Sequence, residues 1–190
     1  FASDIGPGNC LIDEWIRKNS KDKYDESGLI AKSGKINDLI LNQALDNFGD
    51  LLNSSLDIKD FDISFLRGLS LEDGASTITN FTVESIATSL KKLLDKNEYD
   101  YGDHLFPNFI ICGGGRKNKY FMDLLSKSIS EKIGYKKFEL IDQYDIDGDF
   151  VESQAFAFLA IRSFLNLPIS FPETTGCKKP CTGGVIVKNY

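Results

Sequence analysis

The sequence predicts an α/β fold, from helical periodicity in its first half and from the order of elements in its second half. A short apolar run within residues 106–115 ends in three glycines and leads into an amphipathic segment. A second apolar run at 136–141 and another helical segment follow. This order of strand, helix, strand and helix favours a parallel sheet with right-handed crossovers. With 190 residues, 42% of them hydrophobic, the chain can form one domain or one lobe of a larger protein.

Composition and charge exclude several classes of function. The net charge of −6 argues against a nucleic-acid partner, which would need a broad basic surface. No apolar run approaches the roughly 18 to 20 residues of a membrane span, and no signal peptide is visible, so we expect a soluble protein without a membrane partner. The four cysteines, Cys10, Cys112, Cys177 and Cys181, fit neither a disulfide scaffold nor a zinc site, and we expect a reduced, cytoplasmic setting.

The first half is expected to be mostly helical. Asn9 is the predicted N-cap of a helix through CLIDEWIRKN, and a polar surface loop follows it. Apolar residues then recur at helical spacing over 29–48, where Gly34 is expected to split the segment into two helices. Short helices and loops are predicted before Ser70. Ser70 itself, with Asp73 three residues later, predicts the start of a helix of about 20 residues.

The second half is expected to alternate strands and helices. The run FPNFIICGGG predicts a buried parallel strand that leads into a ligand loop. A helix is predicted over 118–133 with Asn118 as its N-cap, and the run KKFELI predicts the next strand. A third strong helix is predicted over 149–165. The tail from Pro168 is expected to wrap around the domain and to end as a short strand.

Three stretches suggest chemistry, and the first is the glycine loop CGGGRKN at 112–118. Ligands of open α/β sheets bind at the carboxyl ends of strands, where glycines let the backbone approach a nucleotide closely. The loop lacks the glycine spacing of a dinucleotide site, which disfavours an oxidoreductase, and it lacks the Lys-Ser/Thr ending of a P-loop, which disfavours Walker-type chemistry. A plain turn capped by Asn118 is the structural alternative.

The second stretch is DGDFVESQAFAFLA at 147–160. Asp149 and Glu152 are three residues apart at a helix start, which is the spacing of a capping box. The functional alternative is a carboxylate that projects from the first helical turn into a cleft and holds a substrate hydroxyl or a water. Spacing alone does not separate the two.

The third stretch is the opening Asp4-Ile5-Gly6-Pro7-Gly8-Asn9. Its glycines and proline predict a turn into a helix start, where free N–H groups favour anions. A carboxylate beside such a loop is unfavourable unless it has a task, such as accepting a proton or holding a metal ion. Asp4 is therefore either a functional acid or an ordinary acidic turn residue.

Taken together and in order, four blocks resemble the C-terminal half of the anhydro-N-acetylmuramic acid kinase family. They are DIGPGN with LIDEWI, then ICGGGRKN, then ESQAFAFLAIR, then PETTG. The resemblance implies a ribonuclease H-like lobe of the sugar kinase, Hsp70 and actin superfamily, incomplete at its N-terminal strands and carrying several packing helices. Residues 1–190 would be the second lobe of a two-lobe kinase, with the N-terminal lobe absent. The absence of an initiator methionine fits this expectation of a fragment.

The resemblance also implies the reaction and its residues. The family opens the 1,6-anhydro bond of anhydro-N-acetylmuramic acid and phosphorylates O6 with ATP and Mg²⁺, giving N-acetylmuramic acid 6-phosphate in peptidoglycan recycling. By position, Asp4 matches the general base and Glu152 the residue that positions the water and the sugar. The cofactor-binding positions fall in two loops: Gly6, Gly8 and Asn9 on the phosphate side, and Gly113, Gly114, Gly115 and Asn118 beside the adenosine.

Two departures from the family pattern limit these expectations. Ile5 replaces the usual threonine beside the acid, which removes a hydroxyl. The first phosphate loop of the family is absent with the N-terminal lobe, so we expect the chain alone to be inactive. Loss of the lobe's first strands would leave an unpaired sheet edge, which favours a homodimer. A nucleotide-gated binding or assembly module of the Hsp70 or actin type is the alternative function.

Overall fold

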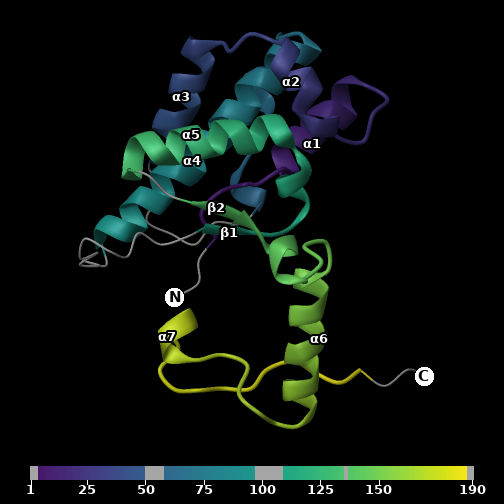
Figure 1. Ribbon diagram of the computed structural model, residues 1–190, viewed down its shortest axis with the longest axis vertical. Helices are drawn as coiled ribbons and strands as arrows, with labels where there is room; N and C mark the ends of the chain where they lie inside the picture. Colours follow the sequence, from purple (N-terminus) through teal and green to yellow (C-terminus); the bar gives the residue numbers. More distant parts are fainter. Residues whose placement is uncertain (1–3, 50–57, 97–108, 135–136, 188–190) are drawn as a thin grey trace.

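A helical body with a small parallel sheet makes up most of the computed structural model, which describes residues 4–49, 58–96, 109–134 and 137–187. Figure 1 shows helices α1 to α5 gathered above the two strands, with α6 extending away from them. The named elements are α1 (Cys10–Asn19), α2 (Leu29–Ser33), α3 (Asp38–Gly49), α4 (Leu71–Lys96), β1 (Phe109–Ile111), α5 (Lys119–Ile133), β2 (Phe138–Leu140), α6 (Val151–Phe164) and α7 (Pro172–Thr175). Short 3₁₀ turns connect several of them.

The long helix α4 is the centre of the body and packs against α1, α2, α3 and α5. Its middle part is buried on nearly every side, since small polar residues such as Ser76, Thr79 and Ser85 are as inaccessible as Ile78. Small side chains let four neighbouring helices approach one central helix closely. The predicted start is confirmed, because the Asp73 backbone N–H donates to the Ser70 hydroxyl at 3.1 Å. The helix runs for 26 residues, longer than predicted.

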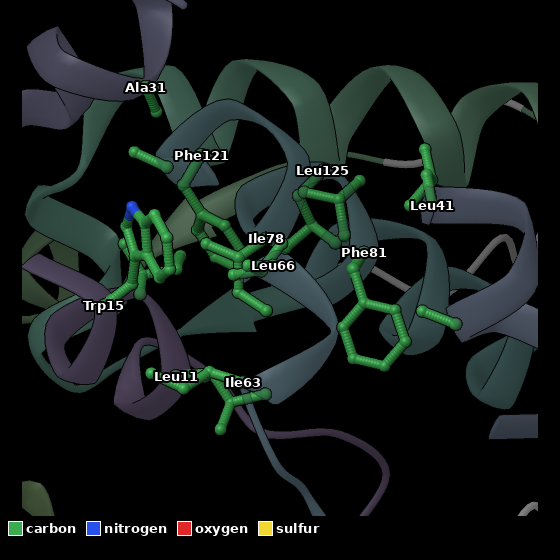
Figure 2. Packing of buried hydrophobic residues seen from close by; sticks show 14 of the residues in the cluster. Leu11, Trp15, Ala31, Leu41, Ile63, Leu66, Ile78, Phe81, Phe121 and Leu125 are labelled. Carbon is green, nitrogen blue, oxygen red and sulfur yellow. The ribbon is translucent and has the colours of Figure 1, made fainter. Parts of the chain in front are cut away.

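The core is a continuous apolar cluster between these helices (Figure 2). Trp15 of α1 packs directly against the backbone of α4 at Gly74, and its indole N–H donates to the Leu71 carbonyl at 2.9 Å. An added Cβ on Gly74 would lie 2.7 Å from Trp15 Nε1 and closer still to two carbons of the ring. The absence of a side chain at this position therefore sets how closely α1 approaches α4.

The predicted split at Gly34 is confirmed, because α2 ends at Ser33 and α3 begins at Asp38. An added Cβ on Gly34 would collide with the backbone of Glu72 and Asp73 at the start of α4. Three apolar residues counted toward the helical pattern, Leu29, Ile36 and Leu39, are in fact exposed. Their position on the outer face explains why the spacing alone was misleading.

The predicted strands form a two-stranded parallel sheet, β1 beside β2, with Phe109 opposite Phe138 and Ile111 opposite Leu140. The helix α5 connects them and packs along α4. The predicted helix over 118–133 agrees with the observed bounds of α5 to within one residue. The α/β class is thus confirmed for the described residues, although helices dominate. The prediction of a buried strand is wrong, because Ile110 in the middle of β1 is 52% exposed.

The prediction that the tail wraps around the domain is wrong. No residue of α6 is buried, and Figure 1 shows α6 and α7 extending below the helical body. After α6 the chain returns through a single antiparallel bridge between Ser170 and Cys181. Val185, at 89% exposure, belongs to no strand. The apolar side of α6, which includes Phe156 and Phe164, has no partner element within the described residues.

Candidate functional site

The opening stretch forms a tight turn that leads into α1. Gly8 has φ +55°, in the left-handed region that favours glycine. The turn closes through a hydrogen bond from the Cys10 backbone N–H to the Pro7 carbonyl at 3.2 Å. Gly6 lies against α4, where an added Cβ would be 2.8 Å from Ile86 Cγ1. The fold thus fixes the turn on the central helix, with Asp4 exposed at its entry.

Asn9 occupies the position before α1, as predicted, but its side chain makes no capping hydrogen bond. Its backbone is already helical, with φ −77° and ψ −7°, whereas a capping residue normally has an extended backbone. The side-chain oxygen Oδ1 is buried and has no hydrogen-bond partner. A buried polar atom left in this state costs about 1 to 3 kcal/mol, so this oxygen requires an explanation beyond capping.

The glycine loop begins directly after β1, at the carboxyl end of the strand. Gly113 has φ +80° and donates its backbone N–H to the Gly148 carbonyl at 3.0 Å. Nothing lies within 4 Å of a Cβ added to Gly113 or Gly114, so the space above the loop is open. Gly115 faces the opening turn, and an added Cβ there would be 3.6 Å from Asn9 Oδ1. The two loops singled out in the sequence therefore lie beside each other.

Asn118 is the N-cap of α5, as predicted. Its Oδ1 accepts a hydrogen bond from the Phe121 backbone N–H at 3.0 Å, and the residue is buried. It packs against Gly28, which has φ +73° and leaves no space for a Cβ between Asn118 and Tyr120. This cap holds the end of the glycine loop in place. The structural role predicted for Asn118 is confirmed.

Arg116 carries a network that joins the glycine loop to the segment before α6. Its Nε and Nη2 donate to the two carboxylate oxygens of Asp142 at 2.7 and 2.8 Å. Its Nη1 donates to Asp149 Oδ1 at 2.6 Å and to the Gly113 carbonyl at 3.0 Å. Lys117 pairs with the other oxygen of Asp149. The guanidinium holds the pKa of the Asp142 carboxyl well below its usual range, and it lowers the pKa of Asp149, with Lys117 contributing.

The capping box predicted from Asp149 and Glu152 is wrong. The N-cap of α6 is Phe150, which makes no side-chain cap, and the carboxylate of Asp149 points to Arg116 and Lys117 instead. Hydrogen bonds between charged groups are stronger than those to a neutral backbone N–H, so the ion pairs determine its orientation. Glu152 is exposed in the first turn of α6, and its side chain has no hydrogen bond or ion pair with any described residue.

The structure thus brings together Asn9, Gly115 and the neighbouring glycines, while no contact links Asp4 to Glu152 among the described residues. The sequence analysis missed Arg116 and its acidic partners. The signal was present as charge complementarity: two basic residues follow the glycines, and Asp142, Asp147 and Asp149 precede the next helix. Pairing them required knowledge that β1 and β2 are adjacent.

No group of three or more His, Cys, Asp and Glu residues is arranged to hold a metal ion in the described part of the chain. Likewise, none of the helices within the described ranges is both long enough and apolar enough to cross a membrane.

The parallel unit of β1, α5 and β2, with a glycine loop at the end of β1, is that of an α/β protein with a loop suited to ligands at its sheet edge. Comparison with known sequences defines the family. The sequence profile of the family described as anhydro-N-acetylmuramic acid kinase matches residues 1–189. The chain therefore belongs to the anhydro-N-acetylmuramic acid kinase family.

Proteins with that same name can be aligned with almost the whole chain. The one from Pelagibacter ubique (strain HTCC1062) is 51% identical over 190 residues, which is 98% of this chain and 48% of the relative. The one from Zymomonas mobilis is 39% identical over 190 residues, which is again 98% of this chain and 48% of the relative. The one from Rhodospirillum rubrum is 36% identical over 185 residues, which is 96% of this chain and 46% of the relative. The chain thus spans about half the length of these curated relatives.

Proposed function

We propose that this chain is the C-terminal, ribonuclease H-like lobe of an ATP-dependent anhydro-N-acetylmuramic acid kinase. Family membership supports the activity, because the relatives carry that name. The observation that carries the proposal for the site is the contact between the two predicted loops. The buried, unpartnered oxygen of Asn9 lies against Gly115, where a donor on the bound ligand, such as a ribose or sugar hydroxyl, would supply the missing hydrogen bond.

The glycine loop fits a nucleotide that approaches the backbone closely. Gly113 needs to be glycine for its positive φ, but Gly114 has neither a positive φ nor a neighbour within 4 Å of an added Cβ. The fold alone therefore gives no reason for glycine at 114. A ligand that lies directly on the backbone would explain why position 114 is glycine. In the proposed complex Gly114 and Gly115 contact the adenosine, while Gly6, Gly8 and Asn9 face the phosphates.

Asp4 and Glu152 have the chemistry for the sugar. ATP supplies the phosphoryl group in the reaction. Asp4 accepts a proton from the attacking water, whose oxygen bonds to the anomeric carbon as the bond from that carbon to O6 breaks. The freed O6 takes the γ-phosphoryl group and ADP leaves. Glu152, exposed and without a partner among the described residues, positions the water and the sugar.

Mg²⁺ would be bound with the nucleotide and not in a protein cage. The described residues contain no cluster of His, Cys, Asp and Glu that could hold an ion. Mg²⁺ in kinases is commonly bridged by nucleotide phosphates and keeps several waters. Use of ATP also agrees with the cytoplasmic setting expected from the cysteines.

The missing N-terminal lobe has two consequences for the isolated chain. Phosphoryl transfer needs charge stabilisation from both sides of the cleft, so the chain alone should be inactive. It should also self-associate, because the apolar face of α6 is exposed and each described strand has only one neighbour. A homodimer or larger assembly by light scattering is expected, and a clean monomer at high concentration would count against this.

The test uses the full-length protein that contains this sequence, incubated with ATP and the anhydro sugar in ¹⁸O-labelled water. The proposal predicts N-acetylmuramic acid 6-phosphate with the label on the anomeric carbon, and no product from the 190-residue chain alone. ATP hydrolysis without sugar turnover would favour the alternative, a nucleotide-gated binding module of the Hsp70 or actin type. Unlabelled product would contradict the role of water.

A further inference from the structure

We propose that Arg116 is a positioning residue that locks the glycine loop into the shape that faces the ligand. It does so by clamping the loop onto the segment that leads into α6. The identity of that ligand as a nucleotide rests on the proposed function. The clamp itself stands on contacts of Arg116 with Gly113, Asp142, Gly148 and Asp149.

The guanidinium group of Arg116 uses most of its hydrogen-bond donors within the protein. Its four hydrogen bonds to Asp142, Asp149 and the Gly113 carbonyl use four of its five N–H donors. The side chain is only 6% exposed. A basic residue beside a glycine loop would ordinarily be taken as a phosphate ligand. The Arg116 guanidinium faces inward and its donors are already used, so it stabilises the loop and does not bind the phosphate.

The clamp is steric as well as electrostatic. Gly148 is buried against the guanidinium, and an added Cβ would lie 2.5 Å from Arg116 Nε and 2.6 Å from Cζ. The same Gly148 accepts the backbone N–H of Gly113 through its carbonyl. Arg116 therefore binds Gly113 on one side and lies on Gly148 on the other. These contacts fix the positive-φ conformation of Gly113 that begins the loop.

Charge supports the same conclusion. The two basic groups of the clamp, Arg116 and Lys117, face three carboxylates, since Asp147 also approaches Arg116 at 3.8 Å. The cluster is therefore not a source of positive potential for an anion. Close contact of this loop with the adenosine depends on the backbone groups of Gly114 and Gly115, which fit a ligand only when their directions are fixed. Fixing them is the role we assign to Arg116.

The test compares Arg116→Gln and Arg116→Lys with a control, Arg17→Lys, whose arginine is exposed and makes one 3.4 Å hydrogen bond to the Lys23 carbonyl. Hydrogen exchange in the full chain should show the Gly113 amide exchanging at least about tenfold faster in the Gln variant. The Lys variant should recover part of the protection, since lysine keeps the charge but loses the two-pronged contact. The control should match the wild type. Unchanged exchange in Arg116→Gln would overturn the proposal.

A second pair of variants tests the steric part. Gly148→Ala alone should speed exchange at Gly113, whereas adding it to Arg116→Ala should change nothing further, because the atoms it would strike are gone. Additive effects in the double variant would contradict the clamp. This result does not depend on any catalytic activity, so it separates the clamp from the proposed function.

In the full-length kinase, Arg116→Gln should raise the KM for ATP about tenfold or more while the KM for the sugar stays within about twofold, because only the nucleotide loop is released. A general loss of folding would move both, and would contradict a positioning role. Equal KM values for ATP in the wild type and the variant would contradict it as well.

Discussion

The contact between Trp15 and Gly74 sets the position of α1, and with it the turn that carries Asp4 and Asn9. Replacing Gly74 with alanine tests this contact. In an exposed helix the change would stabilise the protein by about 1 kcal/mol through helix propensity. Here the new Cβ would lie 2.7 Å from Trp15 Nε1 and nearer to two ring carbons. Trp15 is almost fully buried and cannot move aside without disturbing the core.

The destabilising effects of the substitution are larger than the stability gained from helix propensity. Overpacking of a buried site costs about 1 to 3 kcal/mol, and shifting the ring weakens the hydrogen bond to the Leu71 carbonyl, worth about 1 kcal/mol. The net expectation is a loss of about 2 kcal/mol in the free energy of unfolding. For a chain of this size that corresponds to a fall of about 4 to 8 °C in Tm.

Urea unfolding measures this directly, because Trp15 is the only tryptophan and its fluorescence reports on the altered contact. Far-UV circular dichroism should give the same midpoint, and an unchanged m-value would allow the comparison. Gly49→Ala is the matched control, since Gly49 ends α3 and has nothing within 4 Å of an added Cβ. The control should stay within about 0.5 kcal/mol of the wild type. A Gly74→Ala variant as stable as the wild type would refute the reasoning.

Two further predictions concern the cap of α5 and the cysteines. Asn118→Ala should lower the free energy of unfolding by about 1 kcal/mol through loss of the cap to the Phe121 N–H, whereas Asn118→Asp should retain most of it; equal stability of the two variants would contradict the assignment. Hydrogen bonds lower the pKa of Cys177, and the largest contribution comes from the Thr175 hydroxyl. Burial raises the pKa of Cys10, and the nearby Asp13 carboxylate raises it further. Cys177 therefore carries more thiolate near pH 7.5 and should be alkylated faster than Cys10, with the ratio shrinking as the pH rises above both pKa values. Peptide mapping by mass spectrometry measures this, and faster labelling of Cys10 at pH 7.5 would contradict it.

Features governed by local sequence were predictable. The bounds of α5, the cap at Asn118 and the start of α4 at Ser70 depend on hydrogen bonds that span three residues. The parallel pairing of the strands also followed, because a strand, helix and strand in succession have few ways to pack. The glycine loop was placed correctly at the carboxyl end of β1 for the same reason.

Features governed by distant contacts were not predictable from spacing. Asp149 had the spacing of a cap but is bound by Arg116, which is 33 residues earlier in the chain. Asn9 had the sequence of an N-cap, yet its oxygen is buried against Gly115 from a different element. The sequence of the tail from Pro168 does not show what it packs against, and the apolar composition of α6 before it does not show this either. In α6 residues such as Phe156 remain exposed.

The central claim is that Asp4 is the general base of a kinase whose second lobe is this chain. The most direct measurement is turnover of the anhydro sugar by the full-length protein with Asp4→Asn, beside Asp22→Asn, which makes the same charge change in the exposed loop after α1. The account predicts that Asp4→Asn lowers kcat by about 10²- to 10⁴-fold while ATP binding is retained, and that Asp22→Asn behaves as the wild type. Turnover by Asp4→Asn at the wild-type rate would contradict it.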